Sequence, residues 1–313
     1  MKKVAYCGTL SFLAFLSMSA ALRADDKAVL IMPAADVPPA VIYDGPVFSF
    51  EAEGWGGYNL IAGATGTADP GGFEPLDSLA AYGGDARLAL ILPSGIYLQG
   101  DLIGESTTAN DLNGNNWRSA RTLGGHAGFR DAQNLIGAFG AIGITYSEFD
   151  NFANFRAYGL EFRHNWDNFS ALGQLGYFDS TSDGGDGIAN NFINNGIFAR
   201  GLLKYAISDS AALSGELSFA SAHQGFGGAV NGATIFGWGA RYDQSFDSSP
   251  VSAFLAYDGA SYGNGIGSYV DNVVKVGLQI HFKSGGNNRF GHNADTLDLP
   301  NFGRWVGAGN SID

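Results

Sequence analysis

Residues 272–282, NVVKVGLQIHF, alternate strictly between two kinds of side chain. Every second residue from 274 to 282 is apolar, and the residues between them are polar or small. Successive side chains of a β-strand point to opposite faces of its sheet, so the stretch predicts a strand with one apolar and one polar face. A soluble β-sandwich and a membrane barrel both contain such strands. The pattern along the rest of the chain decides between them.

The same alternation recurs throughout residues 47–282 and predicts about twelve strands, each near the roughly 9–11 residues that a tilted membrane strand needs. We expect them at 47–58, 79–92, 95–105, 117–129, 134–149, 154–165, 168–178, 195–206, 211–220, 233–246, 251–257 and 269–282. Most connections alternate in length, with longer loops at 61–75, 106–116, 180–191, 221–231 and 258–268. Short turns at one end and long loops at the other are typical of outer-membrane barrels.

The stretch 272–282 also resembles the C-terminal targeting strand of bacterial outer-membrane β-barrels, which alternates hydrophobic residues and ends on an aromatic residue. The resemblance implies a membrane-insertion signal, read by the barrel-assembly machinery and formed by Val274, Val276, Leu278, Ile280 and Phe282. By its pattern, the chain up to Phe282 resembles the porin-like superfamily of Gram-negative bacteria. We therefore expect an all-β protein, a single antiparallel up-and-down transmembrane β-barrel in the outer membrane, surrounded by its lipid and lipopolysaccharide.

Aromatic residues gather near the ends of the expected strands, as in the interfacial girdles of membrane barrels. Those expected at the turn end are Phe129, Trp166, Phe169, Tyr205, Tyr242, Phe246 and Phe282. Those expected at the loop end are Trp117, Tyr146, Tyr177, Phe219, Tyr257 and Tyr269. The core of a soluble sandwich is the alternative explanation for the same residues.

The composition agrees with a barrel. The chain has 47 glycines among 313 residues, 13% aromatic residues and only 15% charged residues. Each glycine disfavours a helix interior by about 1 kcal/mol, which argues against a helical fold. The hydrophobic content of 45% argues against disorder. The net charge is −13 and no basic patch is present, so nucleic-acid binding is not expected.

The N-terminus has the pattern of a secretory signal, with Lys2 and Lys3 before an apolar run and small residues at the expected cleavage site. We predict a cleaved signal peptide over 1–24, with a membrane anchor as the alternative. The only cysteine, Cys7, lies within it, so the mature chain would contain no cysteine. Four prolines within 25–46 predict an extended periplasmic leader.

The barrel is expected over 47–282 and a C-terminal periplasmic tail over 283–313. The tail begins KSGGNN, which has the composition of a flexible linker, and then carries apolar residues up to Trp305. Three placements of the tail are compatible with this sequence: docked in the lumen, docked at the periplasmic rim, or loose.

The sequence contains no complete catalytic or metal-binding motif. Residues 259–263, GASYG, match the G-x-S-x-G motif, but the glycines that follow oppose the helix that a nucleophile elbow requires. Asp111, Asn113 and Asn115 resemble the start of a calcium loop that lacks its glycine and its final glutamate. No two of the five histidines have the spacing of a zinc pair. We expect neither an enzyme nor a cofactor or metal.

The charged residues on the predicted inward faces are the remaining functional candidates. We predict that they line a pore, with pairing across a packed, closed interior as the alternative: acidic Glu51, Glu53, Asp85, Asp101, Glu161, Glu216, Asp243 and Asp258, and basic Arg87, Arg163, Arg200, Lys204, Arg241 and Lys275. They predict a channel for passive diffusion of small solutes or ions with a weak preference for cations. Glu51 and Glu53 are expected to reinforce each other in that preference. A closed structural or adhesive barrel and an outer-membrane hydrolase are the alternatives.

Overall fold

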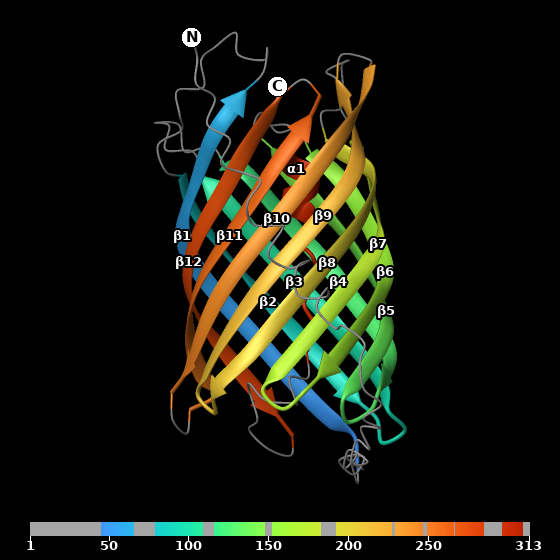
Figure 1. The fold of residues 1–313 in the computed structure, drawn as a ribbon, viewed down its shortest axis with the longest axis vertical. Helices are drawn as coiled ribbons and strands as arrows, with labels where there is room; N and C mark the ends of the chain where they lie inside the picture. Colours follow the sequence, from blue (N-terminus) through green and yellow to red (C-terminus); the bar gives the residue numbers. More distant parts are fainter. Residues whose placement is uncertain are drawn as a thin grey trace, which may run out of the picture. The chain divides into compact units, whose positions relative to one another are not determined.

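The computed structural model describes residues 45–65, 79–108, 116–147, 152–182, 192–226, 229–246, 249–265, 267–284 and 296–308. In these ranges the chain forms twelve strands and one short helix, α1 (Phe302–Gly307) (Figure 1). The strands are β1 (Val47–Thr65), β2 (Leu79–Ile91), β3 (Ile96–Thr108), β4 (Asn116–Arg130), β5 (Asn134–Ser147), β6 (Phe152–Asn165), β7 (Phe169–Ser182), β8 (Ile193–Ser208), β9 (Ala211–Phe226), β10 (Ala229–Ser245), β11 (Val251–Asn264) and β12 (Ser268–Lys283).

The strands form a closed barrel in which each pairs antiparallel with its neighbours in the sequence. The first and last strands close the ring, with Glu51 opposite His281 and Gly57 opposite Lys275. The stretch 272–282 lies in β12, between β11 and β1. The predicted all-β up-and-down barrel is therefore confirmed. Because a closed barrel has no edge strand, every strand finds its backbone partners within the sheet, as a membrane-spanning structure requires.

The outer surface of the barrel is apolar. The alternating residues of β12 face outward, with Val276 63% and Leu278 57% exposed. All the aromatic residues expected at the turn end are exposed too, from Tyr205 at 39% to Phe129 at 70%. The protein thus has the lipid-facing band of an outer-membrane β-barrel and, at the turn end, its aromatic girdle.

Among the loop-end aromatic residues with described side chains, Tyr269 differs from the prediction; the side chain of Trp117 lies outside the described part. Tyr146, Phe219 and Tyr257 are exposed as expected, but Tyr269 is only 2% exposed. Its ring lies inside the barrel and stacks on Tyr262 at a centroid distance of 4.9 Å. The placement of Tyr269 in the girdle was therefore wrong. Its position near a strand end was right, but the period-2 pattern gives Tyr269 the inward face of β12.

The strand ends at the short turns agree with the prediction, whereas those at the other end extend further than predicted. Residues expected to form loops at 221–231 and 258–268 largely belong to the β9–β10 and β11–β12 hairpins. Those two loop predictions were wrong. Beyond the lipid-facing band both faces of a strand can be polar, so apolar alternation ends while the backbone hydrogen bonds continue.

A recurring pair of residues accounts for many of the glycines. Seven inward-facing aromatic side chains each lie over the glycine directly opposite on a neighbouring strand. The pairs are Trp55–Gly83, Phe139–Gly159, Phe155–Gly143, Phe178–Gly196, Phe198–Gly176, Trp238–Gly259 and Phe254–Gly277. A Cβ on any of these glycines would lie less than 3 Å from the ring. The small residue therefore provides the space that its aromatic partner fills.

Replacing Gly277 with alanine is expected to destabilise the barrel by about 1–3 kcal/mol, the usual cost of overpacking. The added Cβ would lie 2.5 Å from both the Gly54 carbonyl oxygen and the Phe254 ring. Gly201→Ala is the matched control, because no atom lies within 4 Å of its Cβ position. Urea unfolding midpoints in detergent would measure the difference. Equal midpoints for the two variants would contradict this account of the glycines.

The C-terminal residues 296–308 lie inside the barrel, as the position of α1 in Figure 1 shows. Of the three placements considered for the tail, this part of the chain has the first, docking in the lumen. The predicted signal peptide lies outside the described residues, as does all of the predicted leader except Gly45 and Pro46. Among the described residues, no helix is long and apolar enough to cross a membrane.

Candidate functional site

The predicted pore-lining residues all lie on the inward faces of their strands, where the alternation of the sequence places them. Many are arranged as ion pairs, either within a strand, between neighbouring strands or across the lumen. Arg87 on β2 contacts Glu51 on β1 at 2.6 Å and Asp85 on its own strand at 2.9 Å. Arg241 on β10 contacts Asp243 at 2.8 Å and, across the lumen, Glu53 at 2.7 Å.

These contacts change the expectation for Glu51 and Glu53. Their carboxylates share the inward face of β1, but each is held by a different guanidinium. The same holds for further members of the set, since Arg200 pairs with Glu216 at 2.7 Å. Cross-strand pairing of opposite charges favours the sheet and reduces the field that any one carboxylate exerts in the lumen.

Lys275 illustrates how a cation is accommodated in the middle of β12. Its ammonium group lies 2.5 Å from a carboxylate oxygen of Asp258 and 4.5 Å from the centre of the Trp55 ring. The carboxylate and the ring face both favour the positive charge. The inward face of the stretch 272–282 therefore places an ion-paired lysine in the lumen.

A buried polar cluster joins the inward faces of β3, β4 and β6. The His126 ring lies between two carboxylates, with Nε2 3.2 Å from Asp101 and Nδ1 2.9 Å from Glu161. Gln174 donates a hydrogen bond of 3.1 Å to Glu161. Asp101 and Glu161 were predicted to line the lumen, but His126 was not. Its position on the same face of β4 as Arg118 and Arg130 is the pattern that would have identified it.

Sequence reasoning missed several further interior charges. They are Glu105, Arg118, Arg130 and Asp271 on the strands, and Asp298 and Arg304 on the tail. The strand residues follow the period-2 pattern of their inward faces and could have been found that way. No pattern in the sequence places Asp298 and Arg304 inside the barrel.

The extended part of the tail, residues 296–301, is hydrogen-bonded to side chains of the wall. The Gln99 amide donates to the Leu297 carbonyl at 2.7 Å and accepts from the Leu297 N–H at 2.8 Å. The Asp298 carbonyl accepts from Gln174 at 3.0 Å and from Arg200 at 2.8 Å, while the Asp298 carboxylate lies 2.9 Å from Arg87. Side chains of the wall thus satisfy the backbone of a segment that lacks regular secondary structure.

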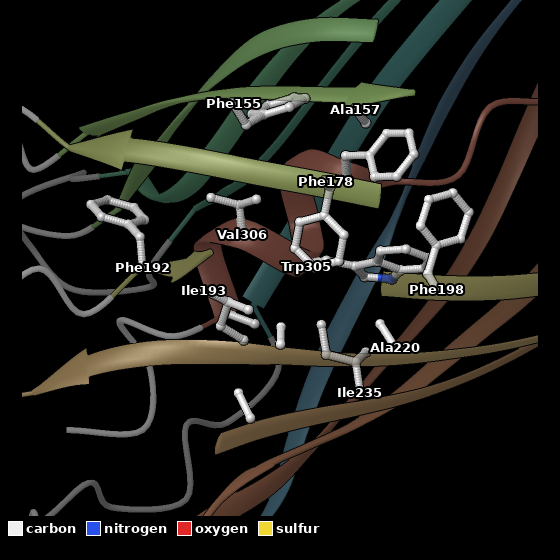
Figure 2. Close-up of a cluster of buried hydrophobic side chains, with 14 of the residues drawn as sticks. Phe155, Ala157, Phe178, Phe192, Ile193, Phe198, Ala220, Ile235, Trp305 and Val306 are labelled. Atoms are coloured by element: carbon white, nitrogen blue, oxygen red, sulfur yellow. The ribbon is translucent and has the colours of Figure 1, made fainter. Parts of the chain in front are cut away.

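The helix α1 packs on an aromatic surface of the inner wall, which we call the seat. The seat consists of Phe139 on β5, Phe155 on β6, Phe178 on β7 and Phe198 on β8, all at most 4% exposed. Phe302 and Trp305 of α1 lie against it, with ring centroids 5.2 and 5.5 Å from Phe198. Figure 2 shows Trp305 between Phe178 and Phe198, with Val306 nearby.

Polar contacts hold both ends of α1. Asp271 on β12, fully buried, receives hydrogen bonds from Arg304 at 3.1 Å and from Arg118 on β4 at 2.5 Å. After the helix, the Ala308 carbonyl accepts a hydrogen bond of 3.0 Å from the Tyr269 hydroxyl. Before it, Asn301 donates to Glu105 at 2.8 Å and caps α1 by accepting from the Arg304 N–H.

A cavity of ≈ 270 Å³ remains beside the tail, lined mainly by strands β7–β12 and β1. Its wall includes the ion-paired Glu53, Arg241 and Lys275, and Trp305 of the tail lines it as well. Ser261, the centre of the G-x-S-x-G match, lies within the regular strand β11 and not at a strand-to-helix turn. The calcium-like residues at 111, 113 and 115 lie outside the described part of the chain.

Several solved outer-membrane barrels are similar to this chain. A KdgM porin matches with 10% identity and a TM-score of 0.38 over 75% of this chain and 99% of that chain. An outer-membrane channel from Pseudomonas putida F1 matches with 9% identity and a TM-score of 0.48 over 76% and 96%. The translocator domain of the autotransporter NalP from Neisseria meningitidis matches with 16% identity and a TM-score of 0.38 over 76% and 88%. These likenesses concern the fold alone.

No protein-family description matches the sequence, and no curated protein sequence is significantly similar to it.

Proposed function

We propose that this barrel is a porin-like channel through which small solutes or ions diffuse passively across the outer membrane. The observation that carries the proposal is the charged cavity beside the tail, enclosed by a barrel with an apolar exterior. A polar interior and a lipid-facing band are the two surfaces that a pore needs. The proposed function is passive diffusion and involves no catalysis.

The second candidate function is a closed barrel with a structural or adhesive role at the cell surface. The docked tail favours it, because residues 296–308 fill part of the lumen with side chains that are mostly buried. The two candidates differ in one measurable property, the passage of ions.

Recording of the purified full-length protein in planar lipid bilayers separates them. The channel proposal expects discrete current steps that scale with the number of inserted molecules. Protein that inserts, as shown by protease protection in vesicles, but carries no current would support the closed barrel instead.

We further propose that the channel weakly prefers cations, since acidic residues outnumber basic ones in the chain and in the predicted lining. Glu51→Gln combined with Glu53→Gln is expected to lower the cation preference, because Arg87 and Arg241 each lose a carboxylate partner. Reversal potentials under a salt gradient measure this. The preference should fade with salt, since the Debye length falls from about 10 Å at 0.1 M to about 3 Å at 1 M.

Lys275→Gln is the matched comparison, because it removes one cation and leaves the Asp258 carboxylate without its ammonium partner. It is expected to raise the cation preference slightly, whereas the double glutamate variant changes it more and in the opposite direction. Anion selectivity of the unmodified protein would rule out the proposed preference. So would identical reversal potentials for the unmodified protein and the double variant.

We also propose that the outward face of β12 acts as a membrane-insertion signal. Val274, Val276, Leu278, Ile280 and Phe282 are each at least 40% exposed on the outer face of β12. An outward apolar face on the last strand is what the barrel-assembly machinery would recognise before the barrel closes onto β1.

A further inference from the structure

We propose that residues 296–308 are a displaceable plug: docked, they block the channel, and solute passes only when α1 leaves the seat. The inference rests on the channel function proposed above. Four independent features of the structure support it, and each concerns the fit between the tail and the wall.

The first feature is the composition of the seat. The lumen side of a water-filled barrel is normally polar. In this barrel Phe139, Phe155, Phe178 and Phe198 point inward from consecutive strands, β5 to β8. Four phenyl rings facing water would be unfavourable, and α1 removes all of them from water. The wall therefore carries an apolar surface that matches the apolar face of this segment.

The second feature is the pairing of buried charge between plug and wall. Asp271 lies between Arg118 of the wall and Arg304 of the plug. Three buried charged groups are compatible with folding when they are paired with one another. With the plug gone, Asp271 would lose one of its two guanidinium partners. The buried charge and the apolar surface of the wall are therefore both covered by the same segment, residues 296–308.

The third feature is the close approach of the backbones. A Cβ on Gly303 would lie 2.3 Å from the Ala120 Cβ, and one on Gly307 would lie 2.8 Å from the Thr145 hydroxyl oxygen. Only glycine brings the helix so near to β4 and β5. No layer of water fits between α1 and this side of the barrel.

The fourth feature is the path of the plug through the lumen. Residue 296 contacts Glu51, close to the turn end of β1, and Ala308 contacts Tyr269, near the opposite end of β12. The segment therefore extends along most of the barrel axis. The charged cavity lies beside it, and its wall includes Trp305.

A reversible cross-link tests the proposal directly. Thr145→Cys combined with Gly307→Cys places a sulfur near the present hydroxyl oxygen, 2.8 Å from the new Cβ, about the separation within a disulfide. Cys7, in the predicted signal peptide, is the only native cysteine. We expect the oxidised protein to carry several-fold less mean current than the reduced protein. Thr145→Cys and Gly307→Cys, each alone, are the controls and should not respond to reductant; the Gly307→Cys control also measures the effect of a side chain added at this closely packed glycine.

The opposite variant releases the plug. Phe302→Ala combined with Trp305→Ala removes the two rings that lie against the seat and is expected to raise the mean current several-fold. The strand pairings are unchanged, and retained resistance of the barrel to SDS would verify that it is folded. Equal mean currents in the oxidised protein, the reduced protein and the Phe302→Ala, Trp305→Ala variant would overturn the plug but not the channel function.

A second readout does not depend on current. A single Ala308→Cys variant places a thiol at a fully buried position of the plug. Labelling by a membrane-impermeant maleimide should be slow in this variant and at least tenfold faster when Phe302→Ala and Trp305→Ala are added. Equal labelling rates would overturn the plug. Different rates without current in any protein would instead overturn the channel function on which the inference rests.

Discussion

Replacing Asp271 with alanine is expected to release the C-terminal segment from the wall without opening the barrel. The carboxylate is fully buried and shared by Arg118 and Arg304. Removing one partner of a buried ion pair typically costs about 3–5 kcal/mol, because buried charge is left behind. Each strand remains hydrogen-bonded on both sides, so the loss falls on the docked segment. We therefore expect cleavage of residues 296–308 by an added protease to become rapid.

The control is Asp179→Ala. Asp179 pairs with Arg156 at 3.1 Å on the outside of the barrel, where the Arg156 side chain is 70% exposed. An exposed ion pair contributes only about 0–1 kcal/mol, so this variant should keep the protease resistance of the unmodified protein. Mass spectrometry of the digests distinguishes the two. A tail that resists protease equally in both variants would show that the Asp271 contacts do not hold it.

Leu175→Arg is expected to prevent stable assembly in the membrane. Leu175 lies in the middle of β7, between Phe169 and Tyr177, and its side chain is 63% exposed on the outer face. An arginine on the lipid face costs about 2–4 kcal/mol at the midplane of the bilayer. The yield of folded, SDS-resistant barrel in lipid vesicles should fall accordingly.

Ile207→Arg is the depth control for this prediction. Ile207 is 53% exposed, at the end of β8 next to a short turn. Near the interface the same substitution costs only about 0–1 kcal/mol, and an arginine there can also reach water. Equal folding yields for the two variants would mean that the outer face of the barrel does not lie in lipid.

The sequence by itself determined the class of fold and the two faces of each strand. Alternation such as that of residues 272–282 is a local property, because successive side chains of any strand point in opposite directions. The inward positions of Glu51, Arg87 and Lys275 follow from it. So do the outward positions of Val276 and Leu278. The turn ends of the strands were predictable for the same reason, since glycine, proline and polar residues interrupt the pattern there.

Other features depended on partners that are distant in the sequence. Glu51 and Glu53 look alike in the sequence, yet one pairs with Arg87 on the adjacent strand and the other with Arg241 across the lumen. The loop-end halves of β9 and β11 were missed because the backbone ladder continues where the apolar alternation stops. The Tyr269 ring points inward, and its hydroxyl donates a hydrogen bond to the Ala308 carbonyl, a partner that is distant in the sequence.

Only the tertiary structure decided the place of the tail. Its sequence shows a linker followed by scattered apolar residues, which is compatible with a docked or a loose segment. Docking depends on the seat, whose four phenylalanines come from four different strands and meet only when those strands pair in the sheet. Apolar burial has no direction and no sequence spacing of its own. The affinity of residues 296–308 for the lumen is therefore a property of the closed barrel and cannot be found in the tail alone.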